Sequence, residues 1–351
     1  MYIKRIFNKG YLKRNISRIP LFYRQWRLYG FSVAFWSLLL PLHHIFERLR
    51  LFLAARKHRA ILLYLRKRYN SILVKPANNN TASNAIIEPE ATIWVCWWDG
   101  EEAMPPLVKI CYNTIRQRAG THPVQLVTKY NVHGFVSIPE YILKKVNAKI
   151  ITITHFTDIL RANLLYEYGG IWMDATILVL KDISFENMPF YTLKTPASKT
   201  DSVTLAAFAG LTNKSMRPVN QASPEISRWS SFMLAGTRHS PVFEYFKDIL
   251  HAYWKEHNEQ IEYLLIDYIF ALCYDNIPVI KKLIDDVPCG ETEHFVLEKS
   301  LNNEFSEEQF AQYSLTVFHK LTWKKHFDIY TKDNKLTIYG HLLNTYNSGE
   351  R

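Results

Sequence analysis

The chain has 351 residues, of which 48% are hydrophobic and 14% aromatic, and a formal net charge of +11 at pH 7. This length suits one large domain with an appendage, or about two domains. The sequence contains no GxGxxG, P-loop, HExxH, GxSxG or zinc-finger spacing, which argues against the classes of enzyme and DNA-binding protein that those motifs mark.

The positive charge is concentrated at the N-terminus. Residues 1–75 contain 17 Lys and Arg against one acid, Glu47, and so carry +16, whereas the remaining 26 basic and 31 acidic residues leave −5. We therefore predict two physically different regions. The first is a basic, amphipathic helical domain over 1–75, and a polar linker over 76–90 joins it to the rest of the chain.

The basic region is typical of a membrane-surface segment. Residues 48–69 alternate aliphatic and basic side chains, and the apolar stretch FSVAFWSLLLPL before them has 12 residues, fewer than the ~20 that span a bilayer. A secretory signal peptide is the rival interpretation, but no small-residue cleavage site follows closely, and the basic continuation opposes translocation. We expect a cytoplasmic protein, in keeping with four cysteines that form no CxxC pair.

That protein is expected to associate peripherally with the anionic inner face of the membrane. The aliphatic content of the basic helix exceeds what phosphate binding needs, so no nucleic-acid partner is expected.

Residues 91–345 read as a second domain in which strands and helices alternate. The predicted elements are a strand over 91–98, helices over 105–118 and 138–145, and strands over 123–128 and 148–154. Such alternation predicts an α/β fold, with a mostly parallel, Rossmann-like sheet flanked by helices and a site at the carboxyl ends of the strands. Trp97 and Trp98 follow the first strand and fall at that edge.

The next segment, TDILRANLLYEYGGIWMDATILVL, gives the strongest signal. We predict a helix with Thr157 as N-cap that ends at Gly169-Gly170, and then a strand over 171–180. Asp158 and Arg161 share a helix face through their i, i+3 spacing. Asp174 is an anomaly, because an ionised group in an apolar strand must be paired, bound to a metal or placed at the open end of the strand.

This segment resembles the donor-binding core of glycosyltransferases with the GT-A fold, in particular glycosyltransferase family 32 and its capsular polysaccharide synthesis branch. The resemblance extends from Thr92 to Trp323. It implies that Asp158 and Arg161 meet the ribose and phosphates of a nucleotide-sugar and that Trp172 lies beside the nucleotide. It also implies that Asp174 binds ribose, sugar or a metal-bound water.

By the same resemblance Trp97 or Trp98 stacks on the base, although a core role is as common for either residue alone.

One position departs from the DxD motif of that family. Thr176 stands where the second Asp, the usual metal ligand, is expected. We predict Mn²⁺ or Mg²⁺ at Asp174 and Thr176, with weaker metal dependence because a hydroxyl carries no charge. The capsular branch often reads Asp-Ala-Thr here, so the change does not imply an inactive enzyme.

Two weaker signals lie downstream. Asp267 falls in a predicted apolar helix over 261–273, where it is either structural or part of an acceptor site, and the resemblance favours function. His319 and Lys320 are adjacent, and the resemblance places them at the donor diphosphate, whose charge must be stabilised as it leaves.

The resemblance thus implies a glycosyltransferase, hexosyltransferase-like and retaining, with Asp174, Arg161 and Asp267 as catalytic residues. Its donor would be a nucleotide-sugar, such as a UDP-sugar, and its acceptor a bacterial capsular or surface polysaccharide or a lipid-linked glycan. One alternative is a non-catalytic basic protein that binds a membrane surface or nucleic acid, in which Asp158, Arg161 and Asp174 are structural. A second is a metal-dependent phosphotransferase using Asp174, which lacks the second carboxylate that such sites usually have.

Overall fold

The computed structural model describes residues 19–44, 49–76, 85–183, 188–196, 218–220, 223–288 and 293–347. These residues form two compact units. The sheet unit comprises the described residues of 85–195, 229–247 and 287–347, and the helical unit comprises those of 19–76, 196–228 and 248–286. The division falls within helix α11 (Pro241–Glu256).

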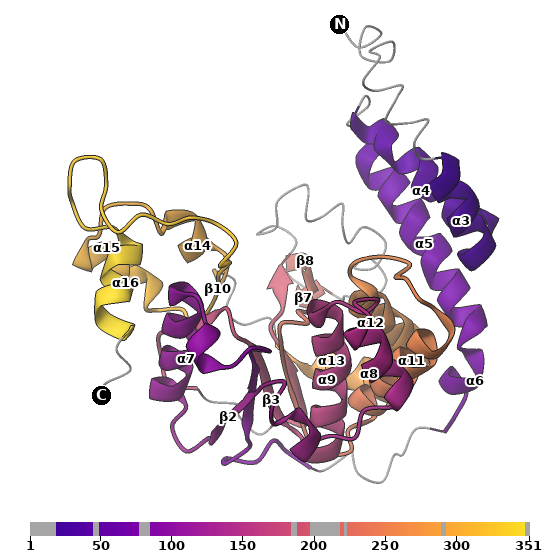
Figure 1. The fold of residues 1–351 in the computed structure, drawn as a ribbon, viewed down its shortest axis with the longest axis horizontal. Coiled ribbons are helices and arrows are strands. Elements are labelled where there is room, and N and C mark those ends of the chain that lie inside the picture. The colour runs from indigo at the N-terminus through magenta and orange to yellow at the C-terminus, as the bar shows by residue number, and fades with distance from the viewer. Residues whose placement is uncertain are drawn as a thin grey trace, which may run out of the picture. The chain divides into compact units, whose positions relative to one another are not determined.

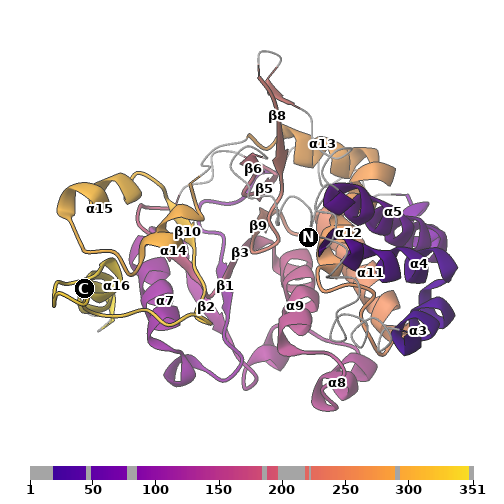
Figure 2. The ribbon, with the colours of Figure 1, turned by 90° about the horizontal axis from the view of Figure 1, so that it is seen from above.

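The sheet unit is built on one five-stranded sheet with the strand order β2-β1-β3-β9-β5. Figure 1 labels β2 and β3 of this sheet, and Figure 2 labels all of its strands. Its strands are β1 (Ile93–Cys96), β2 (Val124–Val127), β3 (Gly170–Asp174), β5 (Phe190–Thr192) and β9 (Met233–Gly236). β1 pairs in parallel with β2 and β3, whereas β9 pairs antiparallel with β3 and β5. In the described part of the chain four of these five strands therefore run in one direction, which confirms the predicted α/β fold with a mostly parallel sheet.

Helices cover both faces of this sheet (Figure 2). Side chains alternate along a strand, so Ile93, Val95, Ile171 and Met173 pack into one core with Val108 and Ile115 of α7 (Pro106–Arg118). On the other face lies α9 (Ile153–Tyr168), where the ring of Trp94 contacts Tyr168. Shorter elements join these layers, namely η3 (Glu101–Ala103), η4 (Val132–Gly134) and α8 (Glu140–Asn147).

The turn between α9 and β3 requires both of its glycines. Gly169 and Gly170 have φ angles of 68° and 96°. A Cβ on Gly169 would lie 2.6 Å from the amide nitrogen of Arg238, and one on Gly170 would lie 2.4 Å from the carbonyl oxygen of Thr92. The chain therefore reverses tightly enough to run β3 back along α9, as predicted from the glycine pair.

Two local predictions before this turn are wrong. Residues 148–154 form no strand, because α8 ends at Asn147 and the amides of Ile150 and Ile151 both bond to the carbonyl of Lys145. The predicted cap, Thr157, lies inside α9, which begins at Ile153 with Thr152 as its N-cap. β-branched residues in this stretch suggested a strand, but the capping hydroxyl of Thr152 starts the helix earlier.

The predicted strand over 171–180 is in fact two strands. β3 ends at Asp174, and after a turn at Ala175 and Thr176 the chain enters β4 (Ile177–Val179). β4 leaves the central sheet and pairs antiparallel with β10 (Phe318–Lys320) in a second, two-stranded sheet. Because β4 pairs with β10 and not with the central sheet, a single apolar run of sequence supplies one strand to each of two sheets.

The C-terminal helices secure β10. They are α14 (Val296–Ser300), α15 (Glu307–Tyr313) and α16 (Ile338–Tyr346). Leu297, Leu301 and Leu342 share an apolar core with Leu107 and Ile110 of α7. This core holds the C-terminal segment, which includes Lys320, in the same unit as β3.

The helical unit contains α3 (Ile19–Tyr29), α4 (Phe31–Leu39), η1 (Leu40–His44), α5 (Arg50–Arg68), α6 (Asn70–Leu73), α12 (Leu265–Asn276) and α13 (Pro278–Asp286). A small sheet of order β6-β8-β7 is formed by β6 (Thr195–Pro196), β7 (Pro218–Asn220) and β8 (Ser223–Arg228). α12 packs against α5 and begins four residues later than predicted. Within the described ranges no helix is both long and apolar enough to cross a membrane.

Part of the N-terminal basic charge is paired within this unit. Arg24 lies against Glu259, Arg68 against Glu256 and Lys75 against Asp248. Lys57 is likewise paired with Glu262. The basic segment is therefore integrated with residues 248–286, and its charge is less available to an external partner than a sequence count suggests.

Candidate active site

The site is centred on Asp174, the last residue of β3. In the strand register Asp174 is level with Cys96 of β1, which in turn is level with Val127 of β2. These residues end their strands, and the Asp174 amide donates to the Phe232 carbonyl at 2.9 Å. The carboxylate thus lies at the carboxyl edge of the parallel strands, where ligands bind in open α/β sheets.

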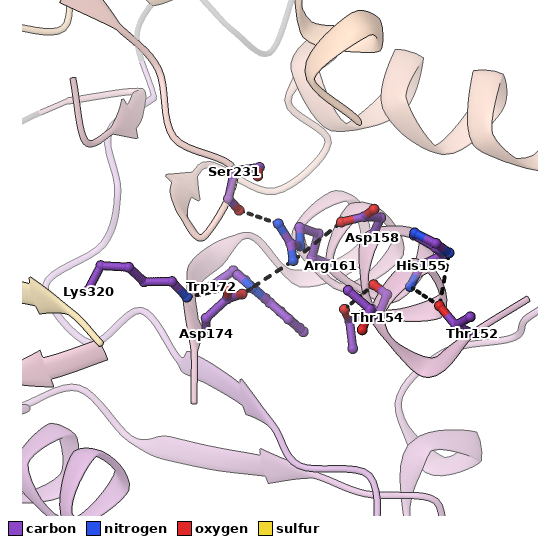
Figure 3. A network of polar contacts seen from close by, with 10 residues as sticks. Thr152, Thr154, His155, Asp158, Arg161, Trp172, Asp174, Ser231 and Lys320 are labelled. Atoms are coloured by element: carbon purple, nitrogen blue, oxygen red, sulfur yellow. Dashed lines mark hydrogen bonds and ion pairs between the residues drawn. The ribbon is translucent and has the colours of Figure 1, made fainter. Parts of the chain in front are cut away.

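Arg161 joins the two predicted acids (Figure 3). Its guanidinium lies 3.3 Å from the carboxylate of Asp174 and 3.4 Å from that of Asp158. The same group donates a hydrogen bond to the carbonyl of Ser231, just before β9. Only 6% of the Arg161 side chain is exposed, and its guanidinium holds the carboxylates of Asp158 and Asp174 in position. The i, i+3 spacing and the glycine turn predicted that these three side chains lie close together.

Trp172 contacts both Arg161 and Asp174. The Arg161 guanidinium lies 5.1 Å from the centroid of the Trp172 ring, and the Trp172 Nε1 donates to Asp174 Oδ1 at 3.0 Å. Only 1% of Trp172 is exposed. The residue therefore supports Arg161 and Asp174 and does not offer the surface beside a nucleotide that the sequence predicted.

Lys320 approaches Asp174 from the opposite side to Arg161 (Figure 3). Its Nζ donates to Asp174 Oδ2 and to Thr176 Oγ1, both at 2.8 Å, and lies 5.0 Å from the centroid of the Phe232 ring. The β4–β10 ladder sets this geometry, because the Leu321 amide also donates to the Thr176 carbonyl. Two segments far apart in the sequence thus meet at one carboxylate.

The charges in this cluster are balanced. Burial alone would raise the pKa of Asp174, but the positive charges of Lys320 and Arg161, with hydrogen bonds from Lys320 and Trp172, lower that pKa below its usual value. Asp174 is therefore ionised at neutral pH. Its side chain is 28% exposed and that of Lys320 is 21% exposed, so an incoming ligand can reach both groups.

The structure does not bring His319 to this cluster. His319 is adjacent to Lys320 in β10 and so points to the opposite face of the strand, where it is 1% exposed. Its Nε2–H donates to the carbonyl of Tyr313 at 3.0 Å. Burial outweighs the backbone of Tyr313 and Thr316, which favours the charged ring, and lowers the pKa of His319 to about 4, so the imidazole is neutral at pH 7. A neutral, buried ring cannot supply the charge predicted for it.

Asp267 belongs to the other unit of the chain. It occupies the first turn of α12 in the helical unit and is 1% exposed. A carboxylate there benefits from the helix dipole. This placement favours a structural role over the predicted role at an acceptor site.

Trp97 and Trp98 follow β1 and lie at the same edge of the sheet as Asp174, as predicted. Both are half-buried. The Trp98 ring packs edge-on against Phe156 of α9, and the Trp97 ring packs edge-on against Trp323, with centroids 5.2 and 5.7 Å apart. Their predicted contact with a base stays a prediction.

The predicted metal ligands fit a divalent cation poorly. Mn²⁺ and Mg²⁺ favour carboxylates, but Asp174 is already bonded by Arg161 and Lys320, and Thr176 offers only a hydroxyl that accepts from Lys320. Among the described residues no group of three or more His, Cys, Asp or Glu side chains could hold a metal ion. A metal here would have to displace the Lys320 ammonium.

Sequence reasoning missed two contributors, Ser231 and Phe232. Both act from the segment before β9, through a carbonyl on Arg161 and a ring beside Lys320. A backbone carbonyl leaves no mark in the sequence, and a single Phe is most often core. Only the pairing of β9 with β3 brings them to the site.

Comparisons with known proteins place the chain in a family. A similar solved structure is the PaToxG glycosyltransferase, at 13% identity and a TM-score of 0.35, covering 69% of this chain and 90% of that chain. No curated protein matches the sequence. The pattern of the family described as capsular polysaccharide synthesis protein matches residues 44–342, whereas membership of glycosyltransferase family 32 stays a prediction. The chain belongs to the family of capsular polysaccharide synthesis proteins.

Proposed function

We propose that this chain is a retaining glycosyltransferase of the GT-A type. It transfers a sugar from a nucleotide-sugar, with a UDP-sugar as the first candidate, to a capsular or other surface polysaccharide or to a lipid-linked glycan. The observation that carries the proposal is the Asp174 carboxylate, held between Arg161 and Lys320 at the carboxyl edge of the sheet. An ionised cluster at this edge is costly for the fold, which favours a functional reason for it.

Each group of the cluster has a role in the proposal. Lys320, which is partly exposed, meets the diphosphate of the donor and stabilises its charge as it leaves. Asp174 holds a hydroxyl of the ribose or of the sugar, and Arg161 keeps Asp174 and Asp158 in place. Trp98 or Trp97 provides a surface for the base.

The transfer balances without a catalytic base from the protein. The bond between the anomeric carbon and the diphosphate oxygen breaks, and the hydroxyl oxygen of the acceptor bonds to the anomeric carbon on the same face. The proton of that hydroxyl passes to the departing diphosphate. Lys320 stabilises the charge that develops on the leaving oxygen.

We further propose that the helical unit attaches the chain to an anionic membrane surface from the cytoplasmic side. Aromatic rings form a continuous chain from Phe22 and Trp26 of α3 through Phe31 of α4 to Phe52 of α5, and the guanidinium of Arg56 lies 5.1 Å from the centroid of the Phe52 ring. Trp26, Phe31 and Phe52 are all about half exposed. Exposed aromatic and basic side chains together suit the boundary between head groups and acyl chains.

The transferase proposal is tested by donor turnover. The full chain would be incubated with a panel of UDP-, GDP- and CDP-linked sugars, and release of the free nucleotide would be measured. We expect turnover of at least one donor by the wild type, loss of that turnover in Asp174→Asn, and normal turnover in Asp182→Asn. Asp182 is a suitable control because it is an exposed acid of the same unit, with 80% of its side chain accessible.

Absence of turnover with every donor, or equal turnover in Asp174→Asn and wild type, would contradict the proposal. The first result would favour a non-catalytic membrane-surface protein. Release of inorganic phosphate in place of a nucleotide would instead favour a phosphotransferase.

A further inference from the structure

Lys320 occupies the position in which a metal ion was expected. Its ammonium bridges Asp174 Oδ2 and Thr176 Oγ1, the two side chains that correspond to the ends of a DxD-like motif, at 2.8 Å from each. Such a motif ordinarily presents carboxylate oxygens to a divalent cation. Here the same two oxygens bind a positive charge that belongs to the protein.

The substitution at Thr176 is consistent with this arrangement. An ammonium between two carboxylates would leave one negative charge in excess. The hydroxyl of Thr176 accepts a hydrogen bond from the ammonium and adds no negative charge. Asp158 and Asp174 face Arg161 and Lys320, so the charges of these four side chains cancel. A divalent cation added to this set would lie against Lys320 and be repelled by it.

Lys320 also retains the capacity to bind a ligand. An ammonium has three N–H donors, and Asp174 and Thr176 use two of them. The third has no hydrogen-bond partner among the residues that the structure describes. Since 21% of the side chain is exposed, a phosphate oxygen can reach this donor.

The position of the ammonium is fixed by the fold. The Lys320 amide donates to the His294 carbonyl at 2.7 Å, and the β4–β10 register places Lys320 opposite Ile177, next to Thr176. The Phe232 ring lies against Nζ, with its centroid 5.0 Å away. A charge held in this way needs little rearrangement to meet a diphosphate.

We propose that Lys320 takes the place of the divalent cation, so that the chain binds the diphosphate of its donor without a metal. This inference rests on the proposed transferase function and specifies how the leaving group is neutralised. Lys320 would be the direct contact, and Asp174 and Thr176 would hold it in position.

Calorimetric titration of UDP into the full chain, once in EDTA and once in MnCl₂, tests the inference. We expect the Kd of the wild type to agree within about twofold between the two buffers. Lys320→Met, which keeps the length of the side chain and removes its charge, should weaken UDP binding about 10- to 100-fold in EDTA. Lys335→Met should bind like wild type, because Lys335 is an exposed residue of the same unit that pairs with Glu304.

The possible results separate this inference from the function on which it rests. Binding of UDP by the wild type only in MnCl₂ would overturn the inference and leave a metal-dependent transferase. Undiminished binding in Lys320→Met would overturn it as well. Failure of UDP, GDP and CDP to bind in either buffer would overturn both the inference and the proposed donor class. The comparison of buffers uses the wild type, so it holds even if Lys320→Met does not fold.

Discussion

The sheet unit and the helical unit both bury polar groups, but of different kinds. In the helical unit, hydrogen bonds join buried neutral groups, such as the hydroxyls of Tyr29 and Tyr253, 3.2 Å apart, and the Glu259 carbonyl to which both donate. The partly buried ions of this unit form a pair, Lys57 with Glu262. Burial raises the pKa of Tyr29 to about 12, so its hydroxyl stays protonated. In the sheet unit the corresponding contacts join ionised side chains around Asp174.

The difference indicates which of the two networks is functional. Neutral hydrogen bonds hold helices together at little cost, because no charge loses its hydration. Charges removed from water are costly unless they are paired well, and an apolar substitute of similar volume often stabilises a protein more. A cluster of ions at the edge of a sheet is therefore better explained by binding than by stability.

The largest expected effect contrasts the two conspicuous acids of the chain. Asp174→Asn should lower donor turnover about 100- to 1000-fold, because the cluster loses the carboxylate that orients Arg161, Lys320 and the bound donor. Asp267→Asn should lower turnover only in proportion to any loss of folded protein, since Asp267 is buried in the helical unit. Turnover rates and circular-dichroism melting curves of both variants would decide this. Equal loss of turnover per folded molecule would restore Asp267 to the site.

The next effect concerns the turn that places Asp174. Gly170→Ala should lower the free energy of unfolding by about 3 kcal/mol or more, because the new Cβ would meet the Thr92 carbonyl in a backbone conformation that favours glycine. Gly134→Ala is the matched control, as nothing lies within 4 Å of the position that its Cβ would take. Urea denaturation measures both. A small effect at Gly170 would mean that the turn can relax without disturbing the site.

A third prediction separates His319 from its neighbour Lys320. The pKa of His319 is about 4 in the folded chain against 6.5 as its ordinary value, so between these pH values the unfolded chain binds more protons. Stability should therefore fall as the pH falls from about 6.5 to about 4, and the His319 contribution should be about 2 kcal/mol smaller at pH 5 than at pH 7.

His319→Gln should remove that contribution and keep UDP binding within about twofold per folded molecule. Urea unfolding at pH 7 and pH 5, with UDP titration at pH 7, provides the measurement. A UDP affinity that fell as far in His319→Gln as in Lys320→Met would place the imidazole at the diphosphate after all.

The smallest expected effect concerns the aromatic surface of the helical unit. Replacing Trp26 and Phe31 together by Ala should weaken binding to vesicles of anionic lipid about tenfold, because both side chains are exposed and apolar. The matched control replaces Leu315 and Ile329, exposed apolar residues of the sheet unit. Co-sedimentation with vesicles at low and high salt would measure the effect. Equal loss in both double variants, or preferential binding of DNA, would contradict the proposed attachment.

Much of the fold was predictable from local patterns. Alternating strands and helices predicted the mostly parallel sheet, and the Gly169-Gly170 pair predicted the turn that returns Asp174 to the side of Arg161. These features depend on neighbours in the sequence. Periodicity and glycine chemistry report such neighbours directly.

The remaining features depend on contacts between distant segments. Nothing in the run from Ile171 to Leu180 shows that it divides between two sheets, because both halves are equally apolar. The bond from Lys320 to Asp174 follows from that division and so was not predictable in detail. The resemblance assigned both His319 and Lys320 to the site, but strand alternation sends the side chains of adjacent residues to opposite faces.

A crystal structure of the chain with UDP bound, grown in EDTA, would show whether Lys320 binds the diphosphate without a metal. We expect a diphosphate oxygen within hydrogen-bonding distance of Lys320 Nζ, at the carboxyl edge of β3, with the uracil ring against Trp97 or Trp98. UDP bound away from Asp174 and Lys320, or Lys320 turned away from the diphosphate, would contradict this expectation.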